Sequence, residues 1–380
     1  MYRFHRPSLA VTASVGALLA LTACGHSTDT AAAPAAGGPI KVDASDTACT
    51  VSAGTANAGN VTFEITNTGS KVTEFYLYAE GDRIMGEAEN IAPGLNRRLI
   101  VEVADAGKYQ TACKPGMAGN GIRGDFTVTG GAAKQADANV LKAQATKSYT
   151  QYVANNSAAL EAQTGKFAEL VKAGKVDEAK ASYAPTRLYY ERIEPVAAKF
   201  GDLDPLVDAR EADLVAGQRF TGFHRLEKDL WKTGLQPDSS QIADKLLADV
   251  KELSAKSQAL GLTALDLANG AKSLMDEVAT GKITGEEEAF SHTDLWDFQG
   301  NLDGSKSAIA SLRPVLQEKD AALMSTLDTE FARVQALLTK QAVGDGFKFY
   351  TDLSHGEIRE LASAVDALSE PLSKVAEVVA

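Results

Sequence analysis

The hydrophobic pattern of this chain changes its period once, shortly after Gly130. Between residues 40 and 130, apolar and polar residues alternate in short runs, such as residues 61–66, and turn signals separate the runs. A period of two is typical of strands with one buried face. From about Ala138 to the end, apolar residues recur every three or four positions, which is typical of helices. The sequence therefore predicts a multidomain protein, with an all-β sandwich over residues 40–130 followed by an all-α helical bundle over residues 131–380.

The first residues have the pattern of an export signal rather than of a folded element. A basic start is followed by an apolar run over residues 9–21, which is too short to span a membrane as a mature helix. The run ends in Leu-Thr-Ala-Cys-Gly, which resembles a bacterial lipobox and predicts a lipoprotein signal peptide over residues 1–23 with lipid attached to Cys24. Residues 24–39 are rich in Ala, Gly, Ser, Thr and Pro and are expected to form a flexible tether. We expect an exported protein that is lipid-anchored to the outer face of the cell membrane or lies in the periplasm.

Charge and cysteine content narrow the possible partners. The chain has 50 acidic and 38 basic residues, so its formal net charge is −12, which argues against nucleic acid as a partner. An acidic exported protein is better matched to cations. If Cys24 carries the lipid, Cys49 and Cys113 remain, and in an oxidising compartment they can form a disulfide or share a metal.

The order of the predicted strands resembles that of a cupredoxin domain, in which a cysteine lies at the end of a late strand. Residues 40–130 contain no histidine, so the usual blue-copper ligand set cannot be built there. Cys49, Glu74 and Cys113 are the candidate ligands for copper or iron, with Met117 as a soft axial contact. The alternative is a structural disulfide between the two cysteines, with Glu74 merely solvated.

The candidate metal site of the helical domain is built around His224 and Glu227. The two residues are three positions apart in a predicted helix over residues 204–231, so an imidazole nitrogen and a carboxylate oxygen lie on one face and can converge on one cation. A His and a Glu at this spacing also occur together by chance on many helices. Acidic clusters elsewhere in this half can supply further oxygens, and they include Glu191, Asp208 and Glu287.

Several motifs resemble those of a known family. In the helical half they are residues 190–195, 200–205, 208–211, 222–231 and 282–287 ahead of 293–298, and in the β half they are Cys49 and residues 72–75, 89–94 and 111–113. The first set resembles the imelysin-like (peptidase M75) domain of the EfeO family, and the second set resembles that family's cupredoxin domain. The resemblance covers nearly everything after the tether.

The resemblance implies an extracytoplasmic component of a ferrous- or ferric-iron uptake system that also includes a membrane permease and a haem peroxidase. The family's His-x-x-Glu motif falls on His224 and Glu227, and its two-cysteine, one-glutamate set falls on Cys49, Glu74 and Cys113. We expect iron to bind in the helical domain, and copper or iron in the β-domain to change its oxidation state or to pass it towards the permease.

Two other functions compete with this expectation, a metal-dependent M75 peptidase and a structural surface lipoprotein. The common zinc-peptidase motif places a Glu beside the first His and a second His four residues after it. Here Arg225 follows His224 and no second histidine lies within a turn, so cation capture is favoured over hydrolysis.

Overall fold

The computed structural model describes residues 38–130, 140–214 and 217–380. The predicted signal peptide, the lipidation site at Cys24 and most of the predicted tether lie outside the described residues. Among the described helices, none combines the length and apolar character needed to cross a membrane.

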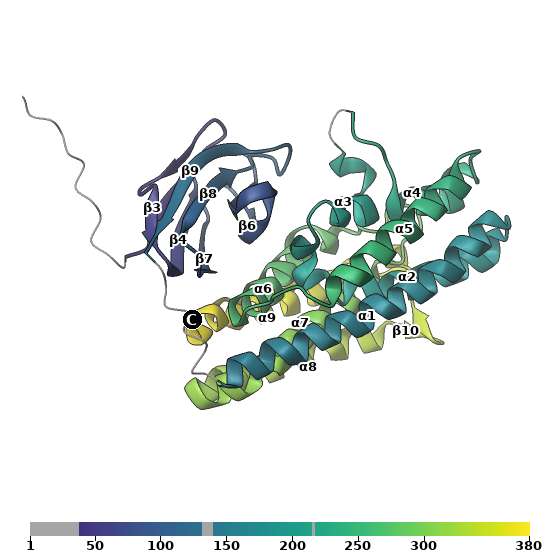
Figure 1. The fold of residues 1–380 in the computed structure, drawn as a ribbon. Coiled ribbons are helices and arrows are strands. Elements are labelled where there is room, and N and C mark those ends of the chain that lie inside the picture. Colours follow the sequence, from purple (N-terminus) through teal and green to yellow (C-terminus); the bar gives the residue numbers. More distant parts are fainter. Residues whose placement is uncertain (1–37, 131–139, 215–216) are drawn as a thin grey trace, which may run out of the picture. The chain divides into compact units, whose positions relative to one another are not determined.

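The β-domain consists of two sheets (Figure 1). One sheet has the strand order β2-β1-β4-β7 and the other has the order β3-β9-β8-β5-β6. Strand β1 runs parallel to β4, whereas β5 runs antiparallel to both β6 and β8. The strands are β1 (Ile40–Ala44), β2 (Cys49–Val51), β3 (Thr55–Asn57), β4 (Gly59–Asn67), β5 (Thr73–Tyr78), β6 (Ile84–Ile91), β7 (Asn96–Val103), β8 (Gly107–Cys113) and β9 (Ile122–Thr129).

Aromatic side chains join the two sheets face to face. Phe63 of β4 lies in the first sheet, and its ring centroid is 5.0 Å from that of Phe75 and 5.6 Å from that of Phe126, both in the second sheet. All three side chains are almost completely buried. Along β4 the burial alternates, so the side chains of Val61, Phe63 and Ile65 face the core, as the period-two pattern predicts. The predicted sandwich is therefore confirmed.

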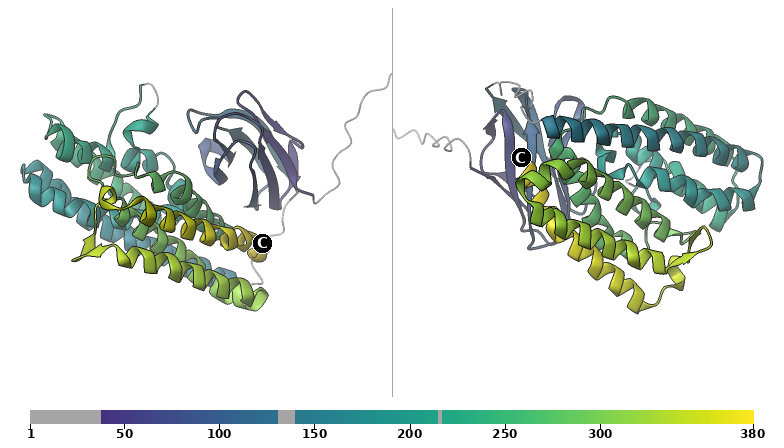
Figure 2. Two further views of the ribbon diagram at one scale, coloured as in Figure 1. Left: turned by 180° about the vertical axis from the view of Figure 1, so that it is seen from behind. Right: turned by 90° about the horizontal axis from the view of Figure 1, so that it is seen from below.

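The second half of the chain is helical, as predicted, and its long helices lie side by side (Figures 1 and 2). Helix α1 packs against α2, α5 and α7, and α9 packs against α6 and α8. The buried positions of α1 include Tyr149, Val153, Leu160 and Phe167, which follow the spacing of a single apolar stripe. The helices are α1 (Val140–Lys172), α2 (Val176–Glu191), α3 (Leu203–Asp208), α4 (Gly222–Lys228), α5 (Ser239–Ser257), α6 (Ala264–Thr280), α7 (Asp294–Lys319), α8 (Ala321–Lys340) and α9 (His355–Val379), and a short hairpin of β10 (Ala342–Val343) and β11 (Gly346–Phe347) precedes α9.

The prediction of one helix over residues 204–231 is wrong in its extent. The chain leaves helical geometry after α3, because Ala209 has a ψ of 128° and Arg210 has a ψ of 153°. A short 3-10 turn follows at Glu211–Asp213, and α-helical geometry returns at α4, which begins at Gly222 with a φ of +79°. Glycine adopts this left-handed backbone without strain, so it allows the chain to turn sharply into α4. The narrower prediction, that His224 and Glu227 share one helix, is confirmed.

Candidate metal centre

Helix α4 is held in the bundle by aromatic packing on the residue before the histidine. Phe223 is fully buried, and its ring centroid is 6.1 Å from Phe167 of α1 and 6.2 Å from Tyr183 of α2. Tyr183 also makes an edge contact with Trp231, at 5.4 Å between centroids. Because consecutive helical residues point in different directions, this anchoring fixes the direction in which His224 projects.

The start of α4 lies directly against the end of α3. A Cβ atom at Gly222 would lie 2.2 Å from the carbonyl oxygen of Val207, so only glycine fits this approach. The Thr221 hydroxyl donates to the carbonyl of Leu206 at 3.1 Å. This contact places Asp208, the last residue of α3, beside the imidazole of His224.

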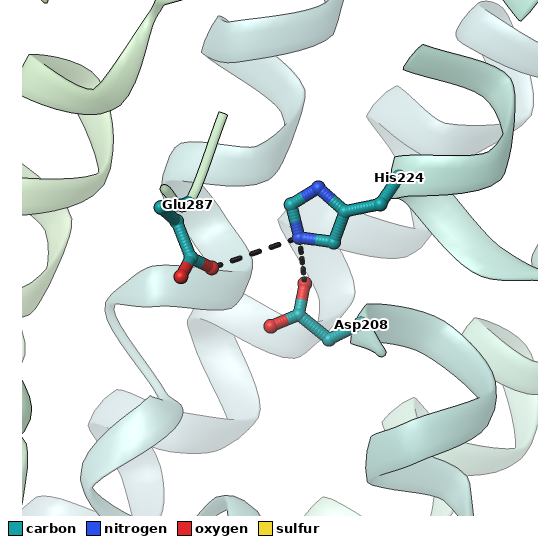
Figure 3. A group of neighbouring side chains, drawn as sticks. All are labelled: Asp208, His224 and Glu287. Atoms are coloured by element: carbon teal, nitrogen blue, oxygen red, sulfur yellow. Dashed lines mark ion pairs between the residues drawn. The ribbon is translucent and has the colours of Figure 1, made fainter. Parts of the chain in front are cut away.

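The His224 ring is buried, with only 2% of its surface exposed, and carboxylates face both of its nitrogens. Nε2 lies 3.6 Å from Oδ1 of Asp208 and 3.6 Å from Oε1 of Glu287 (Figure 3). These distances are too long for hydrogen bonds, and within the described residues Nε2 has no hydrogen-bond partner. Burial and the nearby Arg187 charge each lower the pKa of His224, but the Glu227, Glu287 and Asp208 carboxylates outweigh them and raise it to about 9.

Glu227 holds the other side of the ring. Its Oε2 lies 3.3 Å from Nδ1 of His224, and its Oε1 accepts hydrogen bonds from the backbone N–H groups of Phe290 at 2.8 Å and Ser291 at 2.7 Å. Burial raises the pKa of Glu227, but the hydrogen bonds from His224 and from these two backbone groups lower it below its usual value. Glu227 therefore ties α4 to the loop that carries Glu287, and both of its oxygens have protein partners.

Glu287 lies among several cationic groups. Its Oε1 is 3.2 Å from Nη2 of Arg187 and 3.7 Å from Nζ of Lys282, while its Oε2 is 3.2 Å from Nη1 of Arg210. Burial raises the pKa of Glu287, but Lys282, His224 and Arg210 together hold it well below the usual range. Glu287 is therefore an anion in the folded protein.

Two fully buried cations lie within a larger group of acids, which we call the carboxylate cluster. Arg187 of α2 contacts five of these acids, and Lys282 lies 3.1 Å from Glu191 Oε2 and 2.8 Å from Glu194 Oε1. Burying an isolated charge is very costly, so the acids and the cations stabilise one another here. The carboxylate cluster consists of Glu191, Glu194, Asp208, Glu227, Glu287, Glu288 and Asp297.

The members of the carboxylate cluster differ in their proton affinity. The pKa of Glu191 is lowered, because Lys282 and Arg187 outweigh the effect of burial. Burial and neighbouring acids raise the pKa values of Glu288 and Asp297 well above the usual range. Some acids of the cluster therefore hold protons, whereas others close to them are charged.

Two groups of side chains offer at least three ligand atoms close enough for one metal ion, when only the described residues are considered. One group is Asp208, His224 and Glu287, and the other is His224, Glu227 and Glu288. In the second group Glu227 already accepts hydrogen bonds through both oxygens, and Oε1 of Glu288 is 2.6 Å from Nε of Arg187. The first group presents Nε2 of His224, which has no hydrogen bond to any described residue, and it is the better candidate for holding a cation.

Comparisons with known proteins agree with this architecture. The imelysin (peptidase M75) family model matches residues 145–375, and a cupredoxin-like domain model matches residues 13–128. The chain is 38% identical over 342 residues to the iron uptake system component EfeO of Escherichia coli O157:H7, which covers 88% of this chain and 90% of the relative. The same identity and coverage are found with EfeO of Escherichia coli K12 and of Shigella flexneri. This chain belongs to the EfeO family.

A solved structure shares the fold. The chain resembles the crystal structure of an iron-regulated protein A precursor from Parabacteroides distasonis, with a TM-score of 0.51 at 14% identity. That similarity covers 64% of this chain and 97% of the other. At this identity the similarity concerns the fold alone.

The β-domain of this EfeO-family protein does not assemble the predicted thiolate site. Cys49 and Cys113 form a disulfide, the alternative left open by the sequence, so neither sulfur is a thiolate available to a metal. Glu74 is not solvated but buried, and it accepts a hydrogen bond from the Tyr76 hydroxyl at 3.0 Å. Met117 is 42% exposed. These donors do not fit copper, which binds thiolate and imidazole ligands, and no redox step can be assigned to this domain.

The helical residues predicted from the sequence are brought together in space. His224, Glu227, Asp208 and Glu287 surround one imidazole, and Glu191 joins them through Arg187 and Lys282. Sequence reasoning missed the two buried cations. The available signal was the spacing of Arg187 on α2, four residues after the buried Tyr183 and four before Glu191, which places a cation on an apolar helix face.

Proposed function

We propose that this chain is the extracytoplasmic iron-binding component of an iron uptake system. Iron is captured as cargo in the helical domain by His224 Nε2 together with Asp208 and Glu287. The observation that carries this proposal is the buried Nε2, which faces two carboxylate oxygens at 3.6 Å and has no hydrogen bond within the described residues. One imidazole with carboxylate oxygens matches the ligand preferences of iron. The relatives named as iron uptake components support the same assignment.

In this proposal the two residues of the His-x-x-Glu motif have different tasks. Glu227 accepts a hydrogen bond from Nδ1–H of His224, so in the neutral ring the lone pair is on Nε2, which faces Asp208 and Glu287. Metal-binding histidines usually donate their other N–H to a carboxylate in this way. Glu227 is thus an orienting residue, and Glu191 acts further out by holding the buried cations in place.

Transfer completes the proposed role. The bound iron passes to a membrane permease, and a haem peroxidase belongs to the same system. The location outside the cytoplasm rests on the predicted leader and on lipid attachment at Cys24. The β-domain contributes no copper chemistry in this proposal, because its cysteines are joined in a disulfide.

Metal binding by the full exported chain tests the assignment directly. We expect anaerobic calorimetry with Fe²⁺, repeated with ferric nitrilotriacetate, to show roughly one ion per chain, because one imidazole and two carboxylates make a single site. His224→Ala should weaken binding by at least about tenfold, whereas His355→Ala, a change at the exposed start of α9, should leave it unchanged. Absence of stoichiometric binding, or binding indifferent to His224→Ala, would refute the proposal.

The peptidase alternative has its own test. An unfolded protein substrate incubated with the chain, with and without a chelator, should remain intact, because no general-base Glu lies beside His224 and Lys228 stands where a second histidine would be needed. Cleavage that a chelator inhibits and that disappears in Glu227→Gln would show that the function is hydrolysis and not cation capture.

A further inference from the structure

Arg187 lies inside the carboxylate cluster with no exposed surface. Its Nε lies 2.6 Å from Oε1 of Glu288, and its Nη2 lies 2.5 Å from Oε1 of Glu191. Its Nη1 pairs with Oδ1 of Asp208, and Nη2 also lies 3.2 Å from Oε1 of Glu287. The two terminal nitrogens of one guanidinium group therefore bridge the two acids that face the imidazole.

The contacts of Arg187 involve the same oxygen atoms as the candidate metal centre. Oδ1 of Asp208 and Oε1 of Glu287 are the atoms that lie 3.6 Å from Nε2 of His224 (Figure 3). The same two oxygens accept from Nη1 and Nη2 of Arg187. A cation bound by Nε2 and these oxygens would share its ligands with a second positive charge. Among the described residues the buried Nε2 has no hydrogen-bond partner, which indicates where that cation binds.

Lys282 has a different position. Its Nζ is close to Glu191 and Glu194, at 3.1 and 2.8 Å, and is 3.7 Å from Glu287. Of the two fully buried cations of the carboxylate cluster, Lys282 thus contacts one of the acids that face the imidazole and Arg187 contacts both.

We propose that Arg187 is an internal competitor of the bound cation. Without a cargo ion, its guanidinium group holds Asp208 and Glu287 together although both are acids. When the ion enters, it takes over these oxygens, and at least one Arg187 contact is given up. The inference rests on the proposed function and deepens it, because competition of this kind keeps the ion exchangeable, as hand-over to another protein requires.

Removal of the Arg187 charge provides the test. Two positive charges about 4 Å apart repel each other appreciably even at an effective dielectric constant near 20, so we expect Arg187→Gln to bind Mn²⁺ and anaerobic Fe²⁺ at least about tenfold more tightly than the natural chain. Arg187→Lys keeps the positive charge and should show a smaller gain. As a matched control, Arg192→Gln makes the same chemical change at the end of α2, where the arginine pairs with Asp303 at 2.9 Å, and it should leave the affinity unchanged.

The outcomes separate the two proposals. If the natural chain binds neither ion, the proposed function fails. If the natural chain binds but Arg187→Gln is unchanged or weaker, or Arg187→Lys gains as much as Arg187→Gln, the competitor role alone fails.

The natural chain provides a second measurement, which does not depend on the folding of a variant. In crystals grown with and without Mn²⁺, the bound form should lose the Nη1 contact to Asp208 or the Nη2 contact to Glu287. Retention of both contacts around a bound ion would overturn the inference.

Discussion

Proton competition at His224 predicts how metal affinity depends on pH. The surrounding carboxylates raise the pKa of His224 to about 9, so the ring is mainly an imidazolium at neutral pH. An imidazolium has no free lone pair for a metal. Binding of iron or Mn²⁺ at Nε2 must therefore release a proton, and the measured affinity should rise with pH until the ring is mostly neutral.

The size of the effect follows from the position of this pKa. With a pKa of about 9, roughly one ring in a hundred is neutral at pH 7, which reduces the apparent association constant about a hundredfold, or ~2.7 kcal/mol. Between pH 6.5 and 8.5 the association constant should rise about tenfold per pH unit, because the neutral fraction rises by that factor. The slope should flatten above pH 9.

Titration calorimetry with Mn²⁺ measures both quantities. Repeating the titration at pH 7 in buffers of different ionisation enthalpy should report release of about one proton per ion bound. His224→Asn, which does not titrate, should bind weakly and with little pH dependence over the same range. A change in affinity of less than about threefold between pH 6.5 and 8.5, or binding without proton release, would refute the reasoning about His224.

Three further predictions concern the turn into α4, the disulfide of the β-domain and the orienting role of Glu227. Gly222→Ala should lower the free energy of unfolding by about 2–3 kcal/mol in chemical denaturation. The reason is that alanine would be strained at a φ of +79° and its Cβ would lie 2.2 Å from a carbonyl oxygen. An unchanged denaturation midpoint would contradict this account of the turn. Cys113→Ser should lower the free energy of unfolding by about 4 kcal/mol in the same assay, because the disulfide joins residues with a sequence separation of 64. A variant as stable as the natural chain would show that the disulfide does not contribute to stability. Glu227→Gln should weaken Mn²⁺ binding about 10- to 100-fold while the circular dichroism spectrum stays unchanged. The reason is that an amide no longer fixes the tautomer with a free Nε2. Full affinity in this variant would contradict the orienting role of Glu227.

Local patterns explain which parts of the fold were predictable. The alternation along residues 61–66 and the spacing of His224 and Glu227 depend only on the period of one element, and both were confirmed. The extent of the helix over residues 204–231 was wrong because a positive φ at Gly222 and the close approach to α3 depend on tertiary contact. A glycine inside a helical pattern signals such a break, but the pattern alone does not say whether the helix bends or stops.

The interior of the site was harder to predict because its contacts are far apart in sequence. Arg187 and Glu287 are separated by 100 residues, yet Nη2 and Oε1 lie 3.2 Å apart. The motif residues around His224 identify possible ligands, whereas Arg187 lies outside the motifs and nothing in the motif over residues 282–287 marks Lys282 as buried. The state of Cys49 and Cys113 likewise depended on whether their strands bring them together, and only the folded sandwich decides that.

The energetic cost of the carboxylate cluster is itself an argument about function. Arg187 and Lys282 are fully buried, and each must be taken out of water to reach its acids. Replacing a buried ion pair by well-packed apolar side chains is often neutral or stabilising, so fold stability alone does not account for so many buried charges. Two of the acids hold protons instead of charge, because burial raises the pKa values of Glu288 and Asp297 well above the usual range although Arg187 contacts both. Asp208 and Glu287 face His224 Nε2, which has no hydrogen-bond partner among the described residues, and this is the place where a metal ion can replace the proton of the ring.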